Sequence, residues 1–218
     1  MDSGKPHKES PRPAPRLCVR VSRVEDPSAF ARDFDRMLGG VDVAAMLLCL
    51  PEAGEHAMIE HVKVIAPVIQ SKGIALLLDG HPELVARTGA DGAHMTGIEA
   101  FNAGVDMLKP ARIAGAGGLR TRHDAMLAAE KGADYVMFGE PEPDGRRPDF
   151  DVVSERVAWW AEVFESPCVG FAADLDEVAA LAAAGADFVA LEIPAAAPAA
   201  GLLQAAAERL QAESVRCG

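Results

Sequence analysis

Short apolar runs recur along the chain, and longer stretches with a helical spacing of apolar residues separate them. The apolar runs show little alternation between polar and apolar positions, which is typical of parallel strands that are covered on both faces. The pattern predicts eight strands, near residues 16–21, 41–50, 74–78, 91–95, 112–116, 134–138, 167–171 and 187–192.

The stretches between these runs predict helices, because their apolar residues return every three to four positions. The last two stretches are rich in alanine, the strongest helix former. The predicted helices lie near residues 27–38, 55–71, 82–88, 98–108, 121–131, 149–165, 174–184 and 197–213.

A Gly-Ala-Asp or Gly-Val-Asp tripeptide stands four times at the start of an apolar run. Glycine adopts the left-handed conformation that ends a helix, and an aspartate after it can bind nearby backbone amides. We therefore interpret the tripeptide as a structural signal and not as a catalytic site. The four copies begin at Gly40, Gly89, Gly132 and Gly185.

Strict alternation of strands and helices predicts a parallel sheet, either closed into a barrel or open and doubly wound. Eight strand–helix units favour closure, so we predict a single (β/α)₈ TIM barrel over residues 16–213. The polar, proline-rich residues 1–15 are expected to be a disordered leader, and residues 214–218 a C-terminal tail.

Composition narrows the class of protein further. Half of the 218 residues are hydrophobic, yet no run approaches the roughly 20 apolar residues of a membrane helix. A formal net charge of −12 disfavours nucleic acid as a partner. The leader lacks the apolar run of a signal peptide, which predicts a cytoplasmic protein. The cysteines form no CxxC pair, so we expect reduced thiols.

Catalytic groups of such barrels lie at the carboxyl ends of the strands. His94 ends the fourth predicted strand, where it is either a hydrogen-bonded rim residue or a substrate contact and proton carrier. Carboxylates are abundant at the same edge, namely Glu52, Asp79, Glu99, Glu140, Asp174 and Glu192.

Two segments at this edge are candidates for binding an anion. In the turn from the fifth strand into its helix, the amides of Gly117 and Gly118 and the charge of Arg120 could hold a phosphate. The long loop after the sixth strand is a candidate lid. Its Arg146 and Arg147 either reach the same phosphate or form pairs within the loop.

Three runs at these strand ends stand out: LLLDGHPELVARTGADGAHMTG, GADYVMFGEPEPDGRRP and PCVGFAADLDEVAALAAAGADFVALEI. In this order they resemble the third-to-fourth strand segment, the sixth strand with its mobile loop, and the last two strands of thiamine phosphate synthases. The resemblance covers residues 16–194 in order and spacing and includes the eight-unit barrel.

That family joins hydroxymethylpyrimidine diphosphate to a thiazole phosphate and releases pyrophosphate with the help of Mg²⁺. The resemblance therefore implies a transferase of thiamine biosynthesis whose partners are small phosphorylated heterocycles. It also implies a dissociative substitution, in which the metal stabilises the departing pyrophosphate while the electron-rich pyrimidine carries positive charge.

Matched position by position, the resemblance assigns roles to several residues. His94 corresponds to a family histidine and, with Arg120, is a candidate catalytic residue. The thiazole phosphate is expected at the amides of Ala172 and Ala173, where the family has a glycine pair. The Mg²⁺ ligands that the resemblance implies are Asp79 and Glu99.

Other family positions are occupied by different residue types, which leaves three functions open. The family's metal-binding aspartate is Gly80, and Leu50-Pro51-Glu52 stands where a basic pair is expected. The chain is a diverged thiamine phosphate synthase, a metal-free thiazole tautomerase, or a barrel without catalysis that binds a thiamine precursor or a partner protein. The tautomerase needs a histidine after the fifth strand, where His123 is the nearest. A homo-oligomer also stays open.

Overall fold

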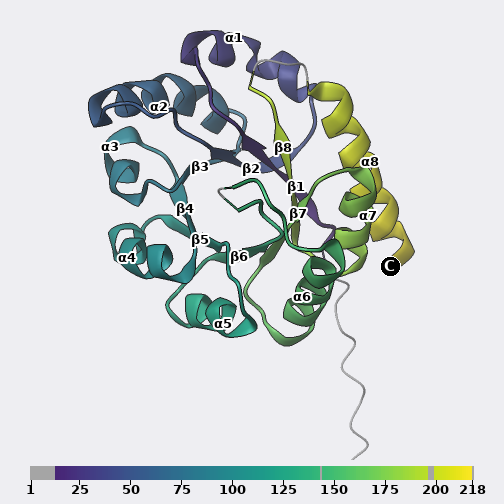
Figure 1. Cartoon of the computed structure of the whole chain (residues 1–218). Helices are drawn as coiled ribbons and strands as arrows, with labels where there is room; N and C mark the ends of the chain where they lie inside the picture. The colour runs from purple at the N-terminus through teal and green to yellow at the C-terminus, as the bar shows by residue number, and fades with distance from the viewer. Residues whose placement is uncertain (1–12, 143, 196–198, 218) are drawn as a thin grey trace, which may run out of the picture.

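Eight parallel strands close into a barrel in chain order (Figure 1). The computed structural model describes residues 13–142, 144–195 and 199–217, with the backbone alone for 214–217, so most of the predicted leader lies outside the described residues. The closed sheet confirms the (β/α)₈ barrel and excludes the open sheet. The strands are β1 (Arg16–Val21), β2 (Val43–Leu48), β3 (Ala75–Asp79), β4 (Gly92–Thr96), β5 (Ile113–Gly117), β6 (Tyr135–Phe138), β7 (Cys168–Ala172) and β8 (Phe188–Ile193).

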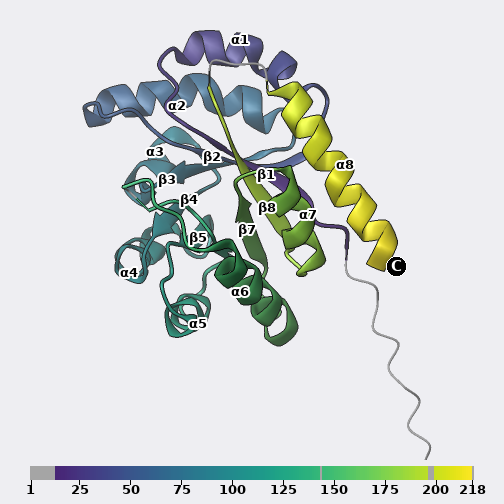
Figure 2. The ribbon, with the colours of Figure 1, turned by 45° about the vertical axis from the view of Figure 1, so that its right-hand side comes forward.

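Helices alternate with the strands and surround the barrel (Figure 2). The predicted ranges agree closely with the observed ones, except that the last helix begins after residue 197 and continues past residue 213, so that the predicted tail is largely helical. The helices are α1 (Pro27–Leu38), α2 (Glu55–Gln70), α3 (Val85–Thr88) after a 3₁₀ turn (Pro82–Leu84), α4 (Ile98–Leu108), α5 (Arg122–Glu130), α6 (Phe150–Val163), α7 (Leu175–Ala183) and α8 (Ala200–Cys217).

The aspartates of the repeated tripeptide tie neighbouring strands together. All four glycines of the tripeptides have φ between 77° and 96°, the left-handed region that favours glycine. Three of the four aspartates accept a backbone amide of the preceding strand, whereas Asp42 pairs with Arg16. These amide bonds join Asp91 to Leu76, Asp134 to Ala114 and Asp187 to Cys168, at 2.7 to 2.8 Å.

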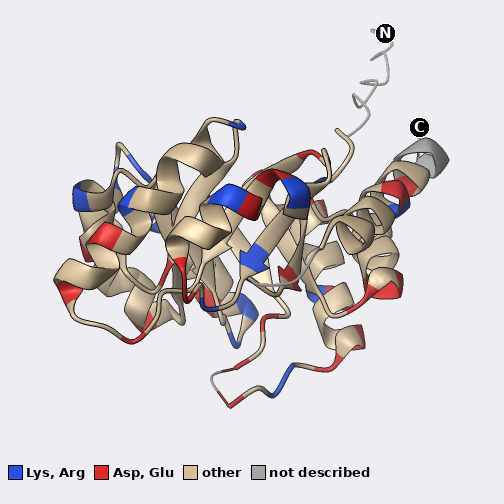
Figure 3. Cartoon of the chain, turned by 90° about the horizontal axis from the view of Figure 1, so that it is seen from above, with Lys and Arg blue, Asp and Glu red and all other residues tan. Residues whose placement is uncertain are grey.

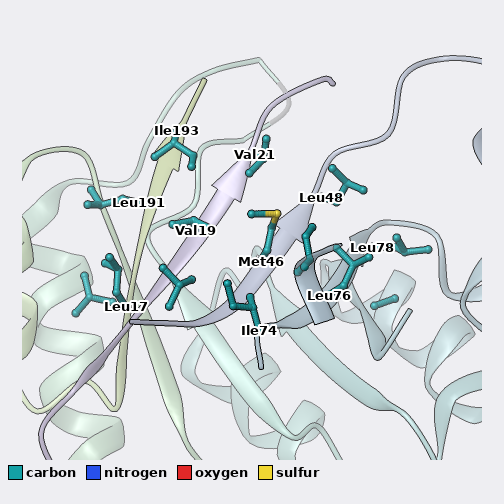
Figure 4. Packing of buried hydrophobic residues seen from close by; sticks show 14 of the residues in the cluster. Leu17, Val19, Val21, Met46, Leu48, Ile74, Leu76, Leu78, Leu191 and Ile193 are labelled. Atoms are coloured by element: carbon teal, nitrogen blue, oxygen red, sulfur yellow. The ribbon is translucent and has the colours of Figure 1, made fainter. Parts of the chain in front are cut away.

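Successive strand residues face either the helices or the barrel interior. Leu17, Val19 and Val21 of β1 are buried on the helix side, where they belong to the large cluster between strands and helices (Figure 4). Leu191 and Ile193 of β8 join the same cluster. This outer layer contains most of the apolar core, so the barrel interior can carry other residue types at its carboxyl end.

Small side chains line the interior at the amino ends of the strands. Ala45, Ala75 and Ala190 border a largely apolar cavity of about 340 Å³. Cys18 lies beside it, and burial raises the pKa of its thiol to about 12. Among the described residues, Cys18 and Cys49 are half-buried free cysteines, and Cys168 is buried.

Acidic and basic positions are interspersed along the helices and loops in the view of Figure 3. Among the described residues, no helix has the length and apolar character needed to cross a membrane.

Candidate active site

A pocket of about 810 Å³ opens at the carboxyl ends of β4, β5 and β6. The loops after these strands form its wall, and the loop between β6 and α6 crosses in front of the ring of strands in Figure 1. The pocket therefore lies at the end of the barrel where the sequence predicts chemistry. Its charged residues are Glu99, Arg120, Asp124, Glu140, Glu142, Arg146, Arg147 and Arg156.

Three polar side chains form a connected group at the wall of this pocket. His94 on β4 is fully buried, and its Nδ1 lies 2.8 Å from the Tyr135 hydroxyl. Its Nε2 lies 2.8 Å from Glu140 Oε1. The other carboxylate oxygen of Glu140 accepts the Gly118 amide at 2.7 Å. The imidazole thus links a phenol inside the barrel to a carboxylate that lines the pocket.

The surroundings of His94 favour its charged form. Burial alone would lower the pKa of His94, but the neighbouring Glu140 carboxylate more than offsets this, so the pKa lies above its ordinary value. Burial raises the pKa of Tyr135 well above its ordinary range, and the phenol keeps its proton. When His94 is neutral, the Tyr135 hydroxyl can donate to Nδ1 while Nε2 donates to Glu140; when it is charged, both ring nitrogens donate.

Glycines on β5 make room for this group. β5 lies between β4 and β6, and a Cβ at Gly115 would overlap the Tyr135 ring and hydroxyl. A Cβ at Gly117 would overlap Glu140 Oε2 and His94 Nε2. His94 can therefore meet Tyr135 on β6 and Glu140 just after β6 only because the strand between them carries no side chain at these two positions.

Two amides that the sequence predicts to hold phosphates donate to carboxylates of the chain itself. The Gly118 amide binds Glu140, as described above. The Ala173 amide donates to Glu177 Oε2 at 2.6 Å, just beyond Ala172 at the buried end of β7. A phosphate at either amide would have to replace a carboxylate.

The three arginines predicted to bind phosphate all line the pocket, but they differ in their contacts. Arg147 donates at 2.9 Å to a backbone carbonyl of β7 and to Glu177, which ties the end of the loop to the barrel. The side chains of Arg120 and Arg146 are 81% and 77% exposed, and Arg146 pairs with Asp144 of its own loop. A ligand can reach Arg120 and Arg146 most easily.

The two predicted metal ligands do not share the pocket. Glu99 lines it, whereas Asp79 at the end of β3 does not. Asp79 accepts hydrogen bonds from Arg20 at 2.9 Å and from the Cys49 thiol at 3.2 Å, and Arg20 also pairs with Glu192 at 3.1 Å. In the part of the chain that the structure describes, no three His, Cys, Asp or Glu side chains are grouped to hold a metal ion.

Sequence reasoning missed the roles of Arg20 and Tyr135. Arg20 is a charged residue inside the apolar run of β1, and Tyr135 is the single tyrosine of the chain. Glu140 was one of many carboxylates at strand ends, and nothing in the sequence distinguished it. His123, on which the tautomerase hypothesis depends, is exposed on α5 and does not line the pocket. Asp174 is the N-cap of α7 and accepts two amides at 2.9 Å.

Comparison with known proteins identifies relatives over most of the chain. A model of the family described as thiamine monophosphate synthase matches residues 22–192. A thiamine-phosphate synthase of Rhodospirillum centenum is 37% identical over 81% of this chain and 86% of its own length. Another from Hyphomonas neptunium is 32% identical over 83% of this chain and 86% of its own length.

Solved structures share the fold. A thiamine phosphate pyrophosphorylase from Pyrococcus furiosus matches with a TM-score of 0.67 and 21% identity, over 93% of this chain and 96% of the other. A putative fructose-1,6-biphosphate aldolase from Coccidioides immitis matches with a TM-score of 0.59 and 14% identity, over 93% of this chain and 90% of the other. Identities this low show the barrel fold alone.

Proposed function

The chain belongs to the thiamine monophosphate synthase family, and we propose that it couples hydroxymethylpyrimidine diphosphate to a thiazole phosphate. The carbon–oxygen bond to the diphosphate breaks, pyrophosphate leaves with the electron pair, and the thiazole nitrogen forms the new bond to the methylene carbon. The protein is thus a transferase of thiamine biosynthesis. Because phosphorylated substrates are retained inside cells, we also propose that the reaction is cytoplasmic.

One observation carries this proposal: a single pocket at the catalytic end of the barrel combines reachable cations with a buried carboxylate. Its volume of about 810 Å³ lies within the range of roughly 300–1,000 Å³ that is usual for small-molecule sites. A ligand that is anionic at one end and develops positive charge at the other fits such a distribution.

The proposed roles follow from which side chains a ligand can reach. Arg120 and Arg146 would bind the diphosphate, because both are exposed at the pocket. The thiazole phosphate would take the place of the Glu177 carboxylate at the Ala173 amide. His94 is fully buried, so it would act on the substrate through another side chain.

Mg²⁺, which the family resemblance implies, would help to neutralise the departing pyrophosphate. Asp79 and Glu99 do not fit this role here. Asp79 is already neutralised by Arg20 and does not line the pocket, so the two carboxylates offer no joint donor set. The pocket arginines supply positive charge without a metal.

The test is a coupling assay with the purified full chain and both substrates, with Mg²⁺ and with EDTA, in which thiamine phosphate and pyrophosphate are measured. We expect product from the wild type. Arg120→Gln and Arg146→Gln should each raise the KM for the pyrimidine diphosphate about tenfold, because each removes a charged phosphate contact. Arg36→Gln is the matched control, since Arg36 is equally exposed on α1 but does not line the pocket.

A barrel that binds a thiamine precursor without turning it over is the second candidate. It is favoured by the carboxylates that occupy the amides of Gly118 and Ala173. Calorimetric binding of the pyrimidine diphosphate without product in the coupling assay would decide for it. If the chain neither binds the pyrimidine diphosphate nor forms product, both candidates are excluded.

A further inference from the structure

Glu140 combines burial with access to the pocket. Its side chain is only 8% exposed, yet it lines the cavity. His94 holds one oxygen at 2.8 Å and the Gly118 amide holds the other at 2.7 Å. Each carboxylate oxygen can accept two hydrogen bonds, so one site on each remains for a ligand. The carboxylate is therefore fixed in place before a substrate arrives.

The other carboxylates of the pocket lack this setting. Glu99 is exposed on the first turn of α4. Asp124 belongs to the capping box of α5. Glu142 is 40% exposed and pairs with Arg146 at 3.6 Å. Glu140 alone among the described carboxylates of this pocket is buried and held by hydrogen bonds on both oxygens.

A pocket that bound only anions would gain nothing from a fixed negative charge in its wall. Placing Glu140 there requires glycine at position 117 and a buried histidine behind it. A buried carboxylate in a site of low dielectric stabilises positive charge more strongly than the same group does in water. This arrangement suits a ligand whose charge becomes positive near Glu140 during the reaction.

We propose that Glu140 is a further catalytic residue, one that accepts a hydrogen bond from the exocyclic amino group of the pyrimidine; the inference rests on the coupling reaction proposed above. When the bond between the methylene carbon and the diphosphate oxygen breaks, both electrons leave with the diphosphate. The positive charge left on the methylene carbon spreads through the ring to the amino nitrogen, whose N–H bonds point to the carboxylate. Attack by the thiazole nitrogen moves the charge to the thiazolium ring, and no proton has to leave.

His94 and Tyr135 are positioning residues in this scheme. The imidazole holds Glu140 from behind, and Tyr135 holds the imidazole from inside the barrel. Neither touches the substrate, because His94 is fully buried and Tyr135 does not line the pocket. The conformation of the carboxylate is thus set by side chains that the substrate does not contact.

The experiment compares Glu140→Gln with the wild type in steady-state coupling assays. Glutamine keeps the shape and removes the charge, so kcat should fall about 100-fold while the KM for the pyrimidine diphosphate changes little. Inorganic pyrophosphate, measured by calorimetry, should bind the variant at least as tightly, because a negative charge has gone. Glu162→Gln, an exposed residue on α6 that does not line the pocket, is the charge-matched control and should leave kcat unchanged.

Each outcome decides between the two proposals. A wild type that couples the substrates and a folded Glu140→Gln variant with the same kcat would overturn the role of Glu140 and leave the coupling reaction standing. A wild type without turnover would remove both. Should Glu140→Gln fail to fold by circular dichroism, Glu140→Asp keeps the charge but withdraws it by one methylene group. A reduced kcat in that variant supports the proposal, and an unchanged kcat overturns it.

Discussion

Gly117 on β5 leaves room for two side chains to meet, His94 from β4 and Glu140 from the loop after β6. Gly117→Ala places a methyl group where both of them lie, so we expect Glu140 to be displaced and kcat to fall about as far as in Glu140→Gln. Overpacking should also lower the free energy of unfolding by about 1–3 kcal/mol. The coupling assay and thermal unfolding measure the two effects.

The control for this substitution is Gly201→Ala on α8. A Cβ at Gly201 meets nothing within 4 Å, and alanine reduces the conformational entropy of the unfolded chain, so stability should rise by less than about 1 kcal/mol with kcat unchanged. A Gly117→Ala protein with the kcat of the wild type would show that Glu140 does not need this space.

The raised pKa of His94 predicts how stability depends on pH. Because its pKa is higher in the folded protein than in the unfolded chain, the charged imidazole contributes stability that is fully present below about pH 6.5. This contribution is lost as pH rises through the raised pKa. Urea unfolding between pH 6 and pH 8 should show a decline that His94→Gln lacks and that exposed His56→Gln retains. Parallel curves for the wild type and His94→Gln would contradict the assignment.

For single residues, the sequence predicted the position along a strand but not the contacts of the side chain. His94 stands at a strand end, and this alone indicated the catalytic edge. Its partners Tyr135 and Glu140 are 41 and 46 residues away, so their contact depends on which strands are neighbours and on a glycine between them. Arg20 and Asp79 are 59 residues apart and lie on β1 and β3, on either side of β2, so their contact also depends on the order of the strands.

At the scale of the elements, the tripeptide aspartates act as links between strands. Asp91 accepts the Leu76 amide at 2.8 Å, whereas Asp42 makes only a surface pair with Arg16. Asp91→Ala should therefore lower the free energy of unfolding by about 1–2 kcal/mol, because it leaves a strand amide without its acceptor. Asp42→Ala is the matched control, with an expected loss below about 1 kcal/mol. Equal unfolding midpoints for the two variants would show that the hydrogen bond to the Leu76 amide contributes no stability beyond that of a surface ion pair.

The strands were predicted well because each is a short apolar run, and four of these runs follow a tripeptide glycine with positive φ. The sequence predicts the end of a strand less well where pairing with the neighbouring strand determines that end. The apolar run of residues 41–50 is longer than β2, whose ladder with β1 ends where Val21 pairs with Leu48. Apolar character indicates that a strand exists, but the length of its partner sets where the ladder stops.

At the scale of the whole molecule, counting eight units was enough to predict closure, since a closed barrel follows from the number of strands. The location of the pocket followed from the same topology. The proposed metal ligands did not follow from the topology, because they were inferred by matching single residues to the family. Asp79 occupies a matching place, yet Arg20, from the first strand, supplies a positive charge to it. Only the closed barrel brings these residues together.

The ion pair between Arg20 and Asp79 leads to a prediction about how Mg²⁺ affects the stability of the folded protein. A ligand present at 100 times its Kd stabilises the folded state by about 2.7 kcal/mol, so pyrophosphate should raise the melting temperature by several degrees. Since Mg²⁺ would have to displace a guanidinium held 2.9 Å from Asp79, the rise should be the same in Mg²⁺ and in EDTA. A wild type stabilised only in Mg²⁺ would mean that the metal takes part in binding pyrophosphate.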